Sequence, residues 1–555
     1  MRVLLVSSAF NSLTQRIQCE LRERGHAVAV EVVPARGGGV TAEAVDRHTP
    51  DLVVAPMLTS AIPHSVWSRH TCLIVHPGPP GDRGPASLDR AIQEGRTRWG
   101  VTVLQAVEEL DAGPVWASSS CVLPGTGKSD VYRGEISDAA VRAVLSAVDR
   151  FGSGGFVPHP PRHLAAMRPR LGQEERRIDW TADSTARVVR RLRAADSQPG
   201  VLDTLLGTEM FLCGGHPEDG LTGRPGEVLA TRQGAICRAT TDGAVWIPEL
   251  RPRRAAGGPP TFKLPAVQAL GGRLPAHVPE VPEPLMAGAG PRTWTDIRYT
   301  EGGAAGFLRF SFPGGAMTTA QCRRLLSAYR FALTRPTQVL VLGGARDFFS
   351  NGIHLGAIEA AGSPAVESWE CINAIDDLVE AVLTTTDRLV VAALAGNAAA
   401  GGAMLALAAD EVWCRSGTVL NPHYRLMGLY GSEYWTYTLP RRVGEATARH
   451  LMDDAQPVGA AAALRLGLVD RVLECETGDF AAETTRSAQA LASSARLRTA
   501  LGRKKARRES DEQTRPLSAY REAELERMRR TFFDPGASYH ALRSAFVRKL
   551  PRPAV

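Results

Sequence analysis

The sequence predicts a multidomain α/β protein with a doubly wound domain, a small β-barrel, a second α/β domain and a helical tail. Apolar runs first alternate with helical patterns, an order typical of a doubly wound sheet. Short β patterns without helices between them follow, and the alternation resumes near residue 295. A length of 555 residues accommodates three or four units of about 150 residues. We place the domain boundaries at 1–165, 166–290, 291–480 and 481–555.

The composition is that of an ordinary globular protein, with 44% hydrophobic and 22% charged residues. A net charge of +7 suits anionic ligands such as a nucleotide phosphate without requiring nucleic acid. Nine cysteines without paired spacing indicate reduced thiols in a cytoplasmic protein, and we expect no metal site. The apolar stretch 389–409 is interrupted by Gly396, Asn397 and Gly401, so it predicts a strand, a loop and a core helix rather than a membrane span.

The expected strands of the first domain are short and apolar. They lie at 3–6, 28–33, 52–55, 73–75 and 101–104, with helices at 13–24 and 128–151. This alternation predicts that the sheet is parallel. The first turn lacks the pattern G-x-G-x-x-G, which disfavours binding of a dinucleotide.

One stretch organises the first half, residues 72–85, with the sequence C-L-I-V-H-P-G-P-P-G-D-R-G-P. Its strand ends at His76, because the prolines and glycines that follow cannot continue a helix or a sheet interior. The imidazole is therefore expected at the carboxyl end of the sheet, where open α/β folds bind ligands. A single histidine at a strand end is, by itself, more often a structural residue. The next strand, at 99–103, and the motif Leu110-Asp111-Ala112-Gly113-Pro114 follow.

This ordered set resembles the 10-formyltetrahydrofolate-dependent formyltransferases. The resemblance implies that His76 and Asp111 handle protons while the formyl group leaves N10 of the folate. It also places Met57, Leu58 and Thr59 where the family holds the pterin through backbone groups, although a packing or turn role is equally open. At Ile74 the family usually has an asparagine that stabilises developing negative charge, so either another donor replaces it or the acceptor is not the usual amine.

The region after residue 177 begins with a basic helical pattern and continues as short β patterns at 210–213, 226–229, 235–239 and 244–247. It resembles the small β-barrel that follows the catalytic domain of methionyl-tRNA formyltransferases. The family's barrel binds tRNA, but this one lacks a basic stripe with interleaved aromatic residues, so RNA is not expected. A linker rich in proline, glycine and alanine at 271–291 ends the region.

The second half resembles the enoyl-CoA hydratase/isomerase (crotonase) superfamily over about residues 295–475. The motifs are F-F-S-N-G-I-H-L at 348–355 and A-G-N-A-A-A-G-G-A-M at 395–404. In the superfamily each element delivers one backbone N–H to a thioester oxygen, which implies the amides of Ile353 and Gly401. Glycine suits such a loop because a side chain would obstruct the substrate carbonyl.

Departures from the superfamily indicate altered chemistry. Hydratases activate water between two glutamates, and Met404 and Tyr424 occupy those positions here. Tyr424 and Glu433 are the polar candidates left near the thioester, with a core tyrosine and a surface glutamate as the alternative. His354 and Asn351 are further candidates for the pocket, and Met404 is expected to serve packing.

Together the two halves resemble the HypX-type maturation proteins of nickel–iron hydrogenases over nearly the whole chain. The resemblance implies transfer of the formyl group of 10-formyltetrahydrofolate to coenzyme A, followed by decarbonylation of formyl-CoA to carbon monoxide. It further implies Arg133, Ser197 and Gln198 as coenzyme A contacts, and hydrogenase assembly proteins as partners. The basic runs of the tail at 503–505 and 507–508 predict a solvated face, though such side chains can also hold phosphates.

Two other functions remain open. The first half alone could formylate another acceptor or hydrolyse the formyl donor, with the crotonase half as a scaffold. Alternatively, both halves could be non-catalytic folate- and coenzyme A-binding modules of an assembly factor.

We predict that the second half does not hydrate enoyl-CoA. Without a pair of glutamates, addition of water across a double bond lacks its general base. Crotonyl-CoA incubated with the protein should lose ultraviolet absorbance at the background rate. Rapid hydration would show that the two glutamate positions have been assigned to the wrong residues.

Overall fold

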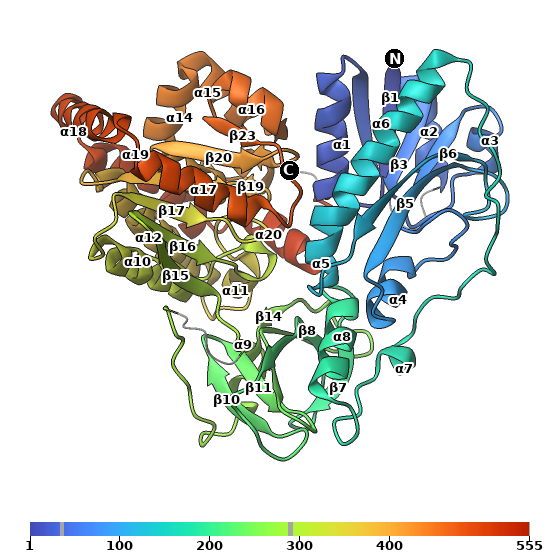
Figure 1. Ribbon diagram of the computed structural model, residues 1–555, viewed down its shortest axis with the longest axis horizontal. Coiled ribbons are helices and arrows are strands. Elements are labelled where there is room, and N and C mark those ends of the chain that lie inside the picture. The colour runs from blue at the N-terminus through green and yellow to red at the C-terminus, as the bar shows by residue number, and fades with distance from the viewer. Residues whose placement is uncertain (34–37, 287–291, 554–555) are drawn as a thin grey trace. The chain divides into compact units, whose positions relative to one another are not determined.

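The chain contains two six-stranded sheets, one in each half, on which most of the helices pack (Figure 1). The computed structural model describes residues 1–33, 38–286 and 292–553. Its internal contacts divide the chain into two units. Unit 1 consists of Met1–Asp179, Ala186–Leu202 and Cys213–Gly215, and unit 2 of Trp180–Thr185, Asp203–Leu212 and His216–Val555.

The sheet of unit 1 has the strand order β2-β1-β3-β4-β5-β6. Its strands are β1 (Arg2–Ser7), β2 (Ala27–Val32), β3 (Leu52–Met57), β4 (Cys72–His76), β5 (Arg98–Gln105) and β6 (Val115–Val122). The helical elements are α1 (Ser12–Glu23), α2 (Gly38–His48), α3 (His64–Trp67), α4 (Ser87–Gln93), α5 (Lys128–Val131), the π-helical turn η1 (Tyr132–Ile136), α6 (Ser137–Ser153), α7 (Gln173–Arg176) and α8 (Thr185–Ala195).

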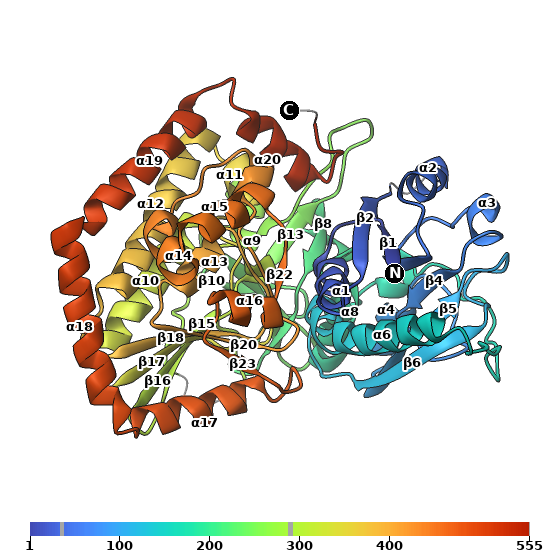
Figure 2. The same cartoon turned by 90° about the horizontal axis from the view of Figure 1, so that it is seen from above.

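Both faces of this sheet are covered, as a doubly wound fold requires. Val3 and Leu5 of β1 belong to the hydrophobic cluster that includes α1 and α6. The alternate residues Leu4 and Val6 belong to a second cluster that includes α2 and α3. Figure 2 shows α1 and α6 side by side on one face. The period of two therefore assigns successive residues to opposite layers.

The prediction of a parallel sheet is correct for β1 to β4 and wrong beyond β4. Strand β5 is antiparallel to β4, and β6 is antiparallel to β5. Apolar runs alone do not fix strand direction, and β6 was missed because Ser118, Ser119 and Ser120 interrupt its apolar pattern. The predicted helix 128–151 is likewise divided by the π-helical turn.

The region predicted to be a small β-barrel is rich in β-strands and forms two four-stranded sheets. Their strand orders are β10-β11-β12-β9 and β14-β13-β8-β7. The elements are β7 (Val201–Leu205), β8 (Thr208–Cys213), β9 (His216–Glu218), β10 (Val228–Arg232), β11 (Ala235–Ala239), β12 (Ala244–Ile247), β13 (Glu249–Pro252), β14 (Leu264–Pro265), α9 (Ala266–Leu270) and η2 (Gly271–Arg273). The last part of the predicted linker, 287–291, lies outside the described residues.

The large sheet of unit 2 has the order β15-β16-β17-β18-β20-β23, and a small sheet β19-β21-β22 accompanies it. Only β15 is antiparallel to its neighbour among these six strands. The strands are β15 (Ile297–Gly302), β16 (Ala305–Phe310), β17 (Val339–Gly343), β18 (Leu389–Leu394), β19 (Ala398–Ala399), β20 (Glu411–Arg415), β21 (Val419–Asn421), β22 (Val458–Gly459) and β23 (Arg471–Leu473). The stretch 389–409 forms β18, β19 and α13 (Gly401–Leu407), which confirms its assignment as strand, loop and core helix.

Helices cover both faces of this sheet and form the tail. They are η3 (Pro313–Gly315), α10 (Thr319–Leu333), α11 (Leu355–Glu359), α12 (Pro364–Thr384), η4 (Tyr424–Met427), α14 (Trp435–Val443), α15 (Glu445–Asp454), α16 (Ala460–Leu466), α17 (Phe480–Ala492), α18 (Arg496–Thr514), α19 (Leu517–Phe533) and α20 (Ser538–Arg548). Among the described residues, no helix combines the length and the apolar character needed to cross a membrane.

One residue of the tail corrects the prediction of a solvated basic face. Lys504 of α18 is buried, and its Nζ donates to the carbonyl of Arg388 at 2.8 Å and to Asp410 at 2.6 Å. The ammonium group is thus paired inside the fold, which the run of charges could not indicate. The tail is packed onto the α/β domain through such contacts.

Candidate functional site

His76 lies at the carboxyl end of β4 with only 5% of its surface exposed. Its Nε2 is 2.9 Å from Oδ2 of Asp82, and its Nδ1 is 3.7 Å from Oδ1 of Asp111. The structure therefore brings His76 and Asp111 together, as predicted, and adds Asp82 on the other side of the ring. The imidazole lies between two carboxylates, an arrangement that orients the ring.

Gly78 allows the close approach of His76 and Asp82. A Cβ at this residue would overlap both the imidazole and the Asp82 carboxylate. The loop is anchored from outside, because Thr102 donates its hydroxyl proton to the carbonyl of Gly78 at 2.8 Å. Trp99 donates to the carbonyl of Pro77 at 2.9 Å in the same way. The proline- and glycine-rich loop is thus a fixed support for the imidazole.

Asp82 was missed by the sequence analysis although it stands within the stretch 72–85. Burial acts to raise the pKa of this carboxyl, but the hydrogen bonds from His76 and Ser87 lower it overall. Asp82 is consequently an anion at neutral pH. The available signal was the acidic residue six positions after the histidine, in a loop that turns back toward the strand end.

Ile74 lies on β4, and the segment 57–59 consists of the last residue of the neighbouring strand β3 and the start of the turn after it. Ile74 pairs with Ala55 and Leu104 and packs partly buried against the cluster that includes α2 and α3. The carbonyl of Met57 accepts from the amide of Ser8 at 2.7 Å, and the amide of Thr59 donates to the Ser8 hydroxyl at 2.9 Å. Leu58 is packed at the edge of the same cluster. These contacts fix the turn after β3.

Arg133, Ser197 and Gln198 lie in two segments of unit 1 that the structure joins. Arg133 belongs to the π-helical turn η1, and the preceding Lys128 donates to the carbonyl of Gln198 at 2.6 Å. Ser129 donates to Asp196 in the same contact. A π-helical turn often accompanies a functional site, because it displaces side chains from the regular helical positions.

The amides of Ile353 and Gly401 lie on adjacent loops of unit 2. The amide of Ala399 donates to the carbonyl of Ser350 at 2.9 Å, and a Cβ on Gly352 would lie 3.0 Å from the nitrogen of Gly401. Within the described part of the chain, neither the Ile353 nor the Gly401 amide has a hydrogen-bond partner. Ala400 has a φ of 46°, a left-handed conformation that sets the direction of the next amide. Two free N–H groups on neighbouring loops can stabilise an oxyanion.

Glu433 faces the same loop. Its Oε1 lies so close to Gly401 that a Cβ there would overlap it. Its Oε2 accepts the hydroxyl proton of Tyr424 at 2.7 Å and the amide proton of Ser432 at 3.1 Å. Glu433 is only 1% exposed, so the alternative of a surface glutamate is wrong. The structure therefore brings all four predicted groups of the second half together.

Burial dominates the acidity of this second group. It raises the pKa of Glu433 to about 7, although the hydrogen bonds from Tyr424 and Ser432 act in the opposite direction. Burial also raises the pKa of Tyr424, and the neighbouring Glu433 charge adds to that effect. Glu433 can therefore take up or release a proton near neutral pH, which suits a general acid or base.

Three further candidates have structural contacts. Met404 is fully buried in the hydrophobic core, as expected. Nδ1 of His354 accepts the amide proton of Ala357 at 2.9 Å and so caps α11, and burial lowers the pKa of His354. The side chain of Asn351 donates to the carbonyl of Gly314 at 2.7 Å.

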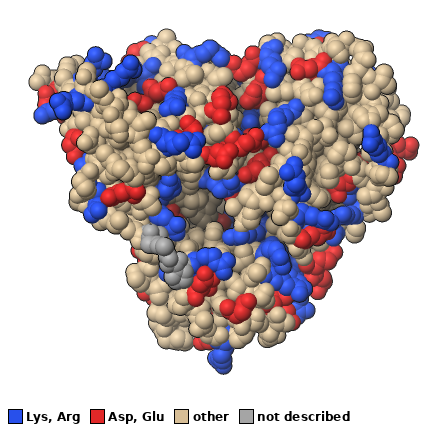
Figure 3. All heavy atoms as spheres, in the orientation of Figure 1, with Lys and Arg blue, Asp and Glu red and all other residues tan. Residues whose placement is uncertain are grey.

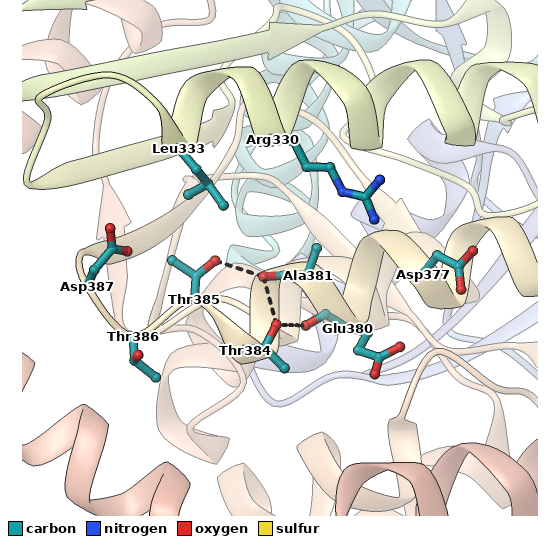
Figure 4. Close-up of a pocket in the computed structure, with 9 residues that line it drawn as sticks. All are labelled: Arg330, Leu333, Asp377, Glu380, Ala381, Thr384, Thr385, Thr386 and Asp387. Atoms are coloured by element: carbon teal, nitrogen blue, oxygen red, sulfur yellow. Dashed lines mark hydrogen bonds between the residues drawn. The ribbon is translucent and has the colours of Figure 1, made fainter.

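A surface groove of about 580 Å³ beside α10 and α12 is separate from these groups (Figure 4). The hydroxyl groups of Thr384 and Thr385 bond to carbonyls of their own helix. None of the predicted site residues lines it, and its polar groups do not converge on a ligand position. Across the ranges that the structure describes, no group of three metal-ligating side chains is placed to hold an ion. Figure 3 shows basic and acidic side chains interspersed on the face that it displays.

Comparisons with known proteins agree with both resemblances. A family model described as formyl transferase matches residues 40–148, its C-terminal domain matches 170–258, and enoyl-CoA hydratase/isomerase matches 317–549. The hydrogenase maturation factor HoxX of Bradyrhizobium diazoefficiens is 49% identical, over 100% of this chain and 95% of that protein. The chain belongs to the HoxX/HypX family of hydrogenase maturation factors.

A solved structure supports the same family. The crystal structure of HypX from Aquifex aeolicus in complex with tetrahydrofolic acid is 44% identical, with a TM-score of 0.95, and the match covers 100% of this chain and 97% of that one. Methionyl-tRNA formyltransferase of Aromatoleum aromaticum is 28% identical over 42% of this chain and 75% of that protein. The HypX-type combination of formyltransferase and crotonase parts is thereby confirmed.

Raising the pH should destabilise the fold around Glu433. The pKa of Glu433 is raised from 4.5 to about 7, and that of Glu524, in α19 behind it, to about 8. Their contribution to stability is complete below about pH 4.5 and declines as the pH rises through 7 and 8, because the folded state then loses the protons that it binds more tightly. The midpoint temperature of thermal unfolding should decrease as the pH is raised from 6 to 9. Glu433→Gln should flatten this fall, whereas parallel curves for both proteins would contradict the assignment.

Proposed function

We propose that the protein transfers the formyl group of 10-formyltetrahydrofolate to coenzyme A and releases carbon monoxide from formyl-CoA for hydrogenase maturation. One observation carries the proposal. A histidine between two carboxylates and a pair of free amides beside a buried glutamate occur in one chain. The tetrahydrofolate bound to HypX of Aquifex aeolicus supports folate as the formyl carrier.

The first step would belong to His76. The thiol sulfur attacks the formyl carbon, the bond from that carbon to N10 breaks, and the thiol proton passes to N10. His76 would accept the proton from the thiol and deliver it to N10, with Asp82 and Asp111 stabilising the imidazolium between the two transfers. Without an amide at Ile74, the negative charge that develops on the formyl oxygen needs a donor other than the family's asparagine.

The second step would belong to Glu433. The amides of Ile353 and Gly401 would polarise the formyl carbonyl of the thioester. Glu433 would take the proton from the formyl carbon as the bond between carbon and sulfur breaks. It would then return that proton to the thiolate, so that carbon monoxide and free coenzyme A remain. Tyr424 would hold the ionised carboxylate by its hydrogen bond. Coenzyme A is regenerated, so the net reaction converts 10-formyltetrahydrofolate into tetrahydrofolate and carbon monoxide.

Ligand positions follow the same assignment. The backbone of Met57, Leu58 and Thr59 would hold the pterin, beside the strand end that carries His76. Arg133, Ser197 and Gln198 would contact coenzyme A. The recipient of the carbon monoxide would be the hydrogenase assembly machinery in the cytoplasm, which makes hydrogenase assembly proteins the expected partners.

The deciding experiment incubates the purified protein with 10-formyltetrahydrofolate and coenzyme A. Absorbance reports tetrahydrofolate, and haemoglobin spectra report carbon monoxide. Equal amounts of both products would support the proposal. Tetrahydrofolate with formate, or with another formylated product, would instead indicate a transferase or hydrolase, and binding without turnover would indicate an assembly factor.

Replacement of His76 should impair the reaction assigned to the first half. His76→Ala should lower tetrahydrofolate formation by roughly 10²–10⁴, the usual contribution of a general acid and base. Asp82→Asn keeps the shape of the side chain but removes its charge, and should cost about ten- to a hundredfold. The exposed His64 provides the control variant His64→Ala. Turnover of His76→Ala close to that of this control would place the site elsewhere.

Replacement of Gly401 should impair only the reaction assigned to the second half. A Cβ at this position would displace the Glu433 carboxyl from the oxyanion loop. Gly401→Ala should therefore lower carbon monoxide release by about 10²–10³, while tetrahydrofolate formation persists. Gly362→Ala is the matched control, because a Cβ there meets open space. Undiminished carbon monoxide from Gly401→Ala would exclude decarbonylation at this loop.

A further inference from the structure

The backbone that carries Glu433 has an unusual conformation. Glu433 and Tyr434 are consecutive residues with φ values of 59° and 58°. L-residues with side chains disfavour the left-handed region, and two in succession persist only where the surroundings fix them. Because the side-chain direction of Glu433 depends on this backbone, whatever fixes the loop also fixes the carboxyl beside Gly401.

Two fully buried carboxyl groups hold this loop. Oδ1 of Asp376, on α12, accepts the amide proton of Glu433 at 2.8 Å and the hydroxyl proton of Ser432 at 3.0 Å. Oε2 of Glu524, on α19, accepts the amide proton of Tyr434 at 2.9 Å. Oε1 of Glu524 accepts the amide proton of Thr436 at 2.8 Å and also its hydroxyl proton.

The burial of Asp376 and Glu524 does not increase the stability of the folded state. Within the described ranges, neither makes an ion pair, and Oδ2 of Asp376 is buried without any hydrogen-bond partner. The nearby Arg521 instead binds Asp377 and Glu380 on the surface of α12. Burial raises the pKa of Asp376 and of Glu524. A buried carboxyl group without a counter-ion lowers the stability of the folded state. What these two groups contribute instead is the set of hydrogen bonds that they accept from the loop.

We propose that Asp376 and Glu524 are positioning residues that set the Glu433 carboxyl against Gly401. The tail helix α19 is then part of the reactive apparatus of the second half. This inference rests on the proposed function for the role of Glu433, but the holding of the loop is independent of it.

The two carboxyl groups differ in a way that sharpens the test. Asp376 accepts through one oxygen only, so Asp376→Asn can retain both contacts with its amide oxygen. Glu524 accepts through both oxygens, so Glu524→Gln must turn an amide N–H₂ toward either the Tyr434 or the Thr436 amide. Asparagine should therefore substitute for Asp376, whereas glutamine should not substitute for Glu524 and leucine should not substitute for Asp376.

The experiment uses the full chain and two readouts. Hydrogen exchange of peptides that cover 431–436 reports the loop, and carbon monoxide per tetrahydrofolate reports the reaction. Glu524→Gln and Asp376→Leu should exchange faster in this segment and lose carbon monoxide on the order of 10²-fold, with tetrahydrofolate formation unchanged. Asp376→Asn should behave as the wild type in both readouts.

Two control variants change acidic residues that do not contact the loop. Asp377→Asn and Glu526→Gln alter exposed acids of the same two helices and should leave both readouts unchanged. Loop exchange equal to that of the wild type in Glu524→Gln would overturn the inference, as would faster exchange with full carbon monoxide release. If Asp376→Leu does not fold, the isosteric Glu524→Gln decides alone. A wild type that makes no carbon monoxide would remove the proposed function, and the exchange readout would still decide whether the two acids hold the loop.

Discussion

A carboxyl oxygen of Glu433 lies where a side chain at residue 401 would begin. This contact places an ionisable group beside two free amides, because Ile353 and Gly401 lie on loops joined by backbone hydrogen bonds. The arrangement depends on the left-handed Ala400 on one side and on the left-handed Glu433 on the other. Strained backbone on both sides of one contact is expected where geometry serves chemistry rather than stability.

The carboxyl groups of the two halves have pKa values shifted in opposite directions. In unit 1 the pKa of Asp82 is lowered by its hydrogen bonds, so an anion faces the imidazole of His76. In unit 2 burial raises the pKa of Glu433, so the neutral acid is accessible near neutral pH. The first environment places an anion against a buried imidazole, and the second allows a carboxyl group to exchange a proton near neutral pH. One chain thus contains two buried ionisable clusters with different electrostatic environments.

Motifs with a fixed order along the chain were predictable, and contacts across the fold were not. The stretch around His76 and the glycine-rich loop at Gly401 identified both halves, because strand ends and glycines have local causes. Asp82 needed knowledge of how its loop turns back. The antiparallel β5 and β6 could not be derived from apolar runs, since these indicate burial and not direction. Lys504 and Glu524 belong to charged tail helices, and their burial depends on tertiary packing that a run of charges does not indicate.

The contact between Glu524 and Thr436 spans 88 residues of sequence. During synthesis at about 5–20 residues per second, the loop that carries Glu433 waits roughly 4–18 s for the helix that fixes it. The histidine of unit 1 and its two carboxylates have all emerged long before that. A nascent chain would therefore complete the histidine cluster of unit 1 first and the loop that carries Glu433 last. The order of translation itself would keep the second site unfinished until the tail helix that holds its loop has been made.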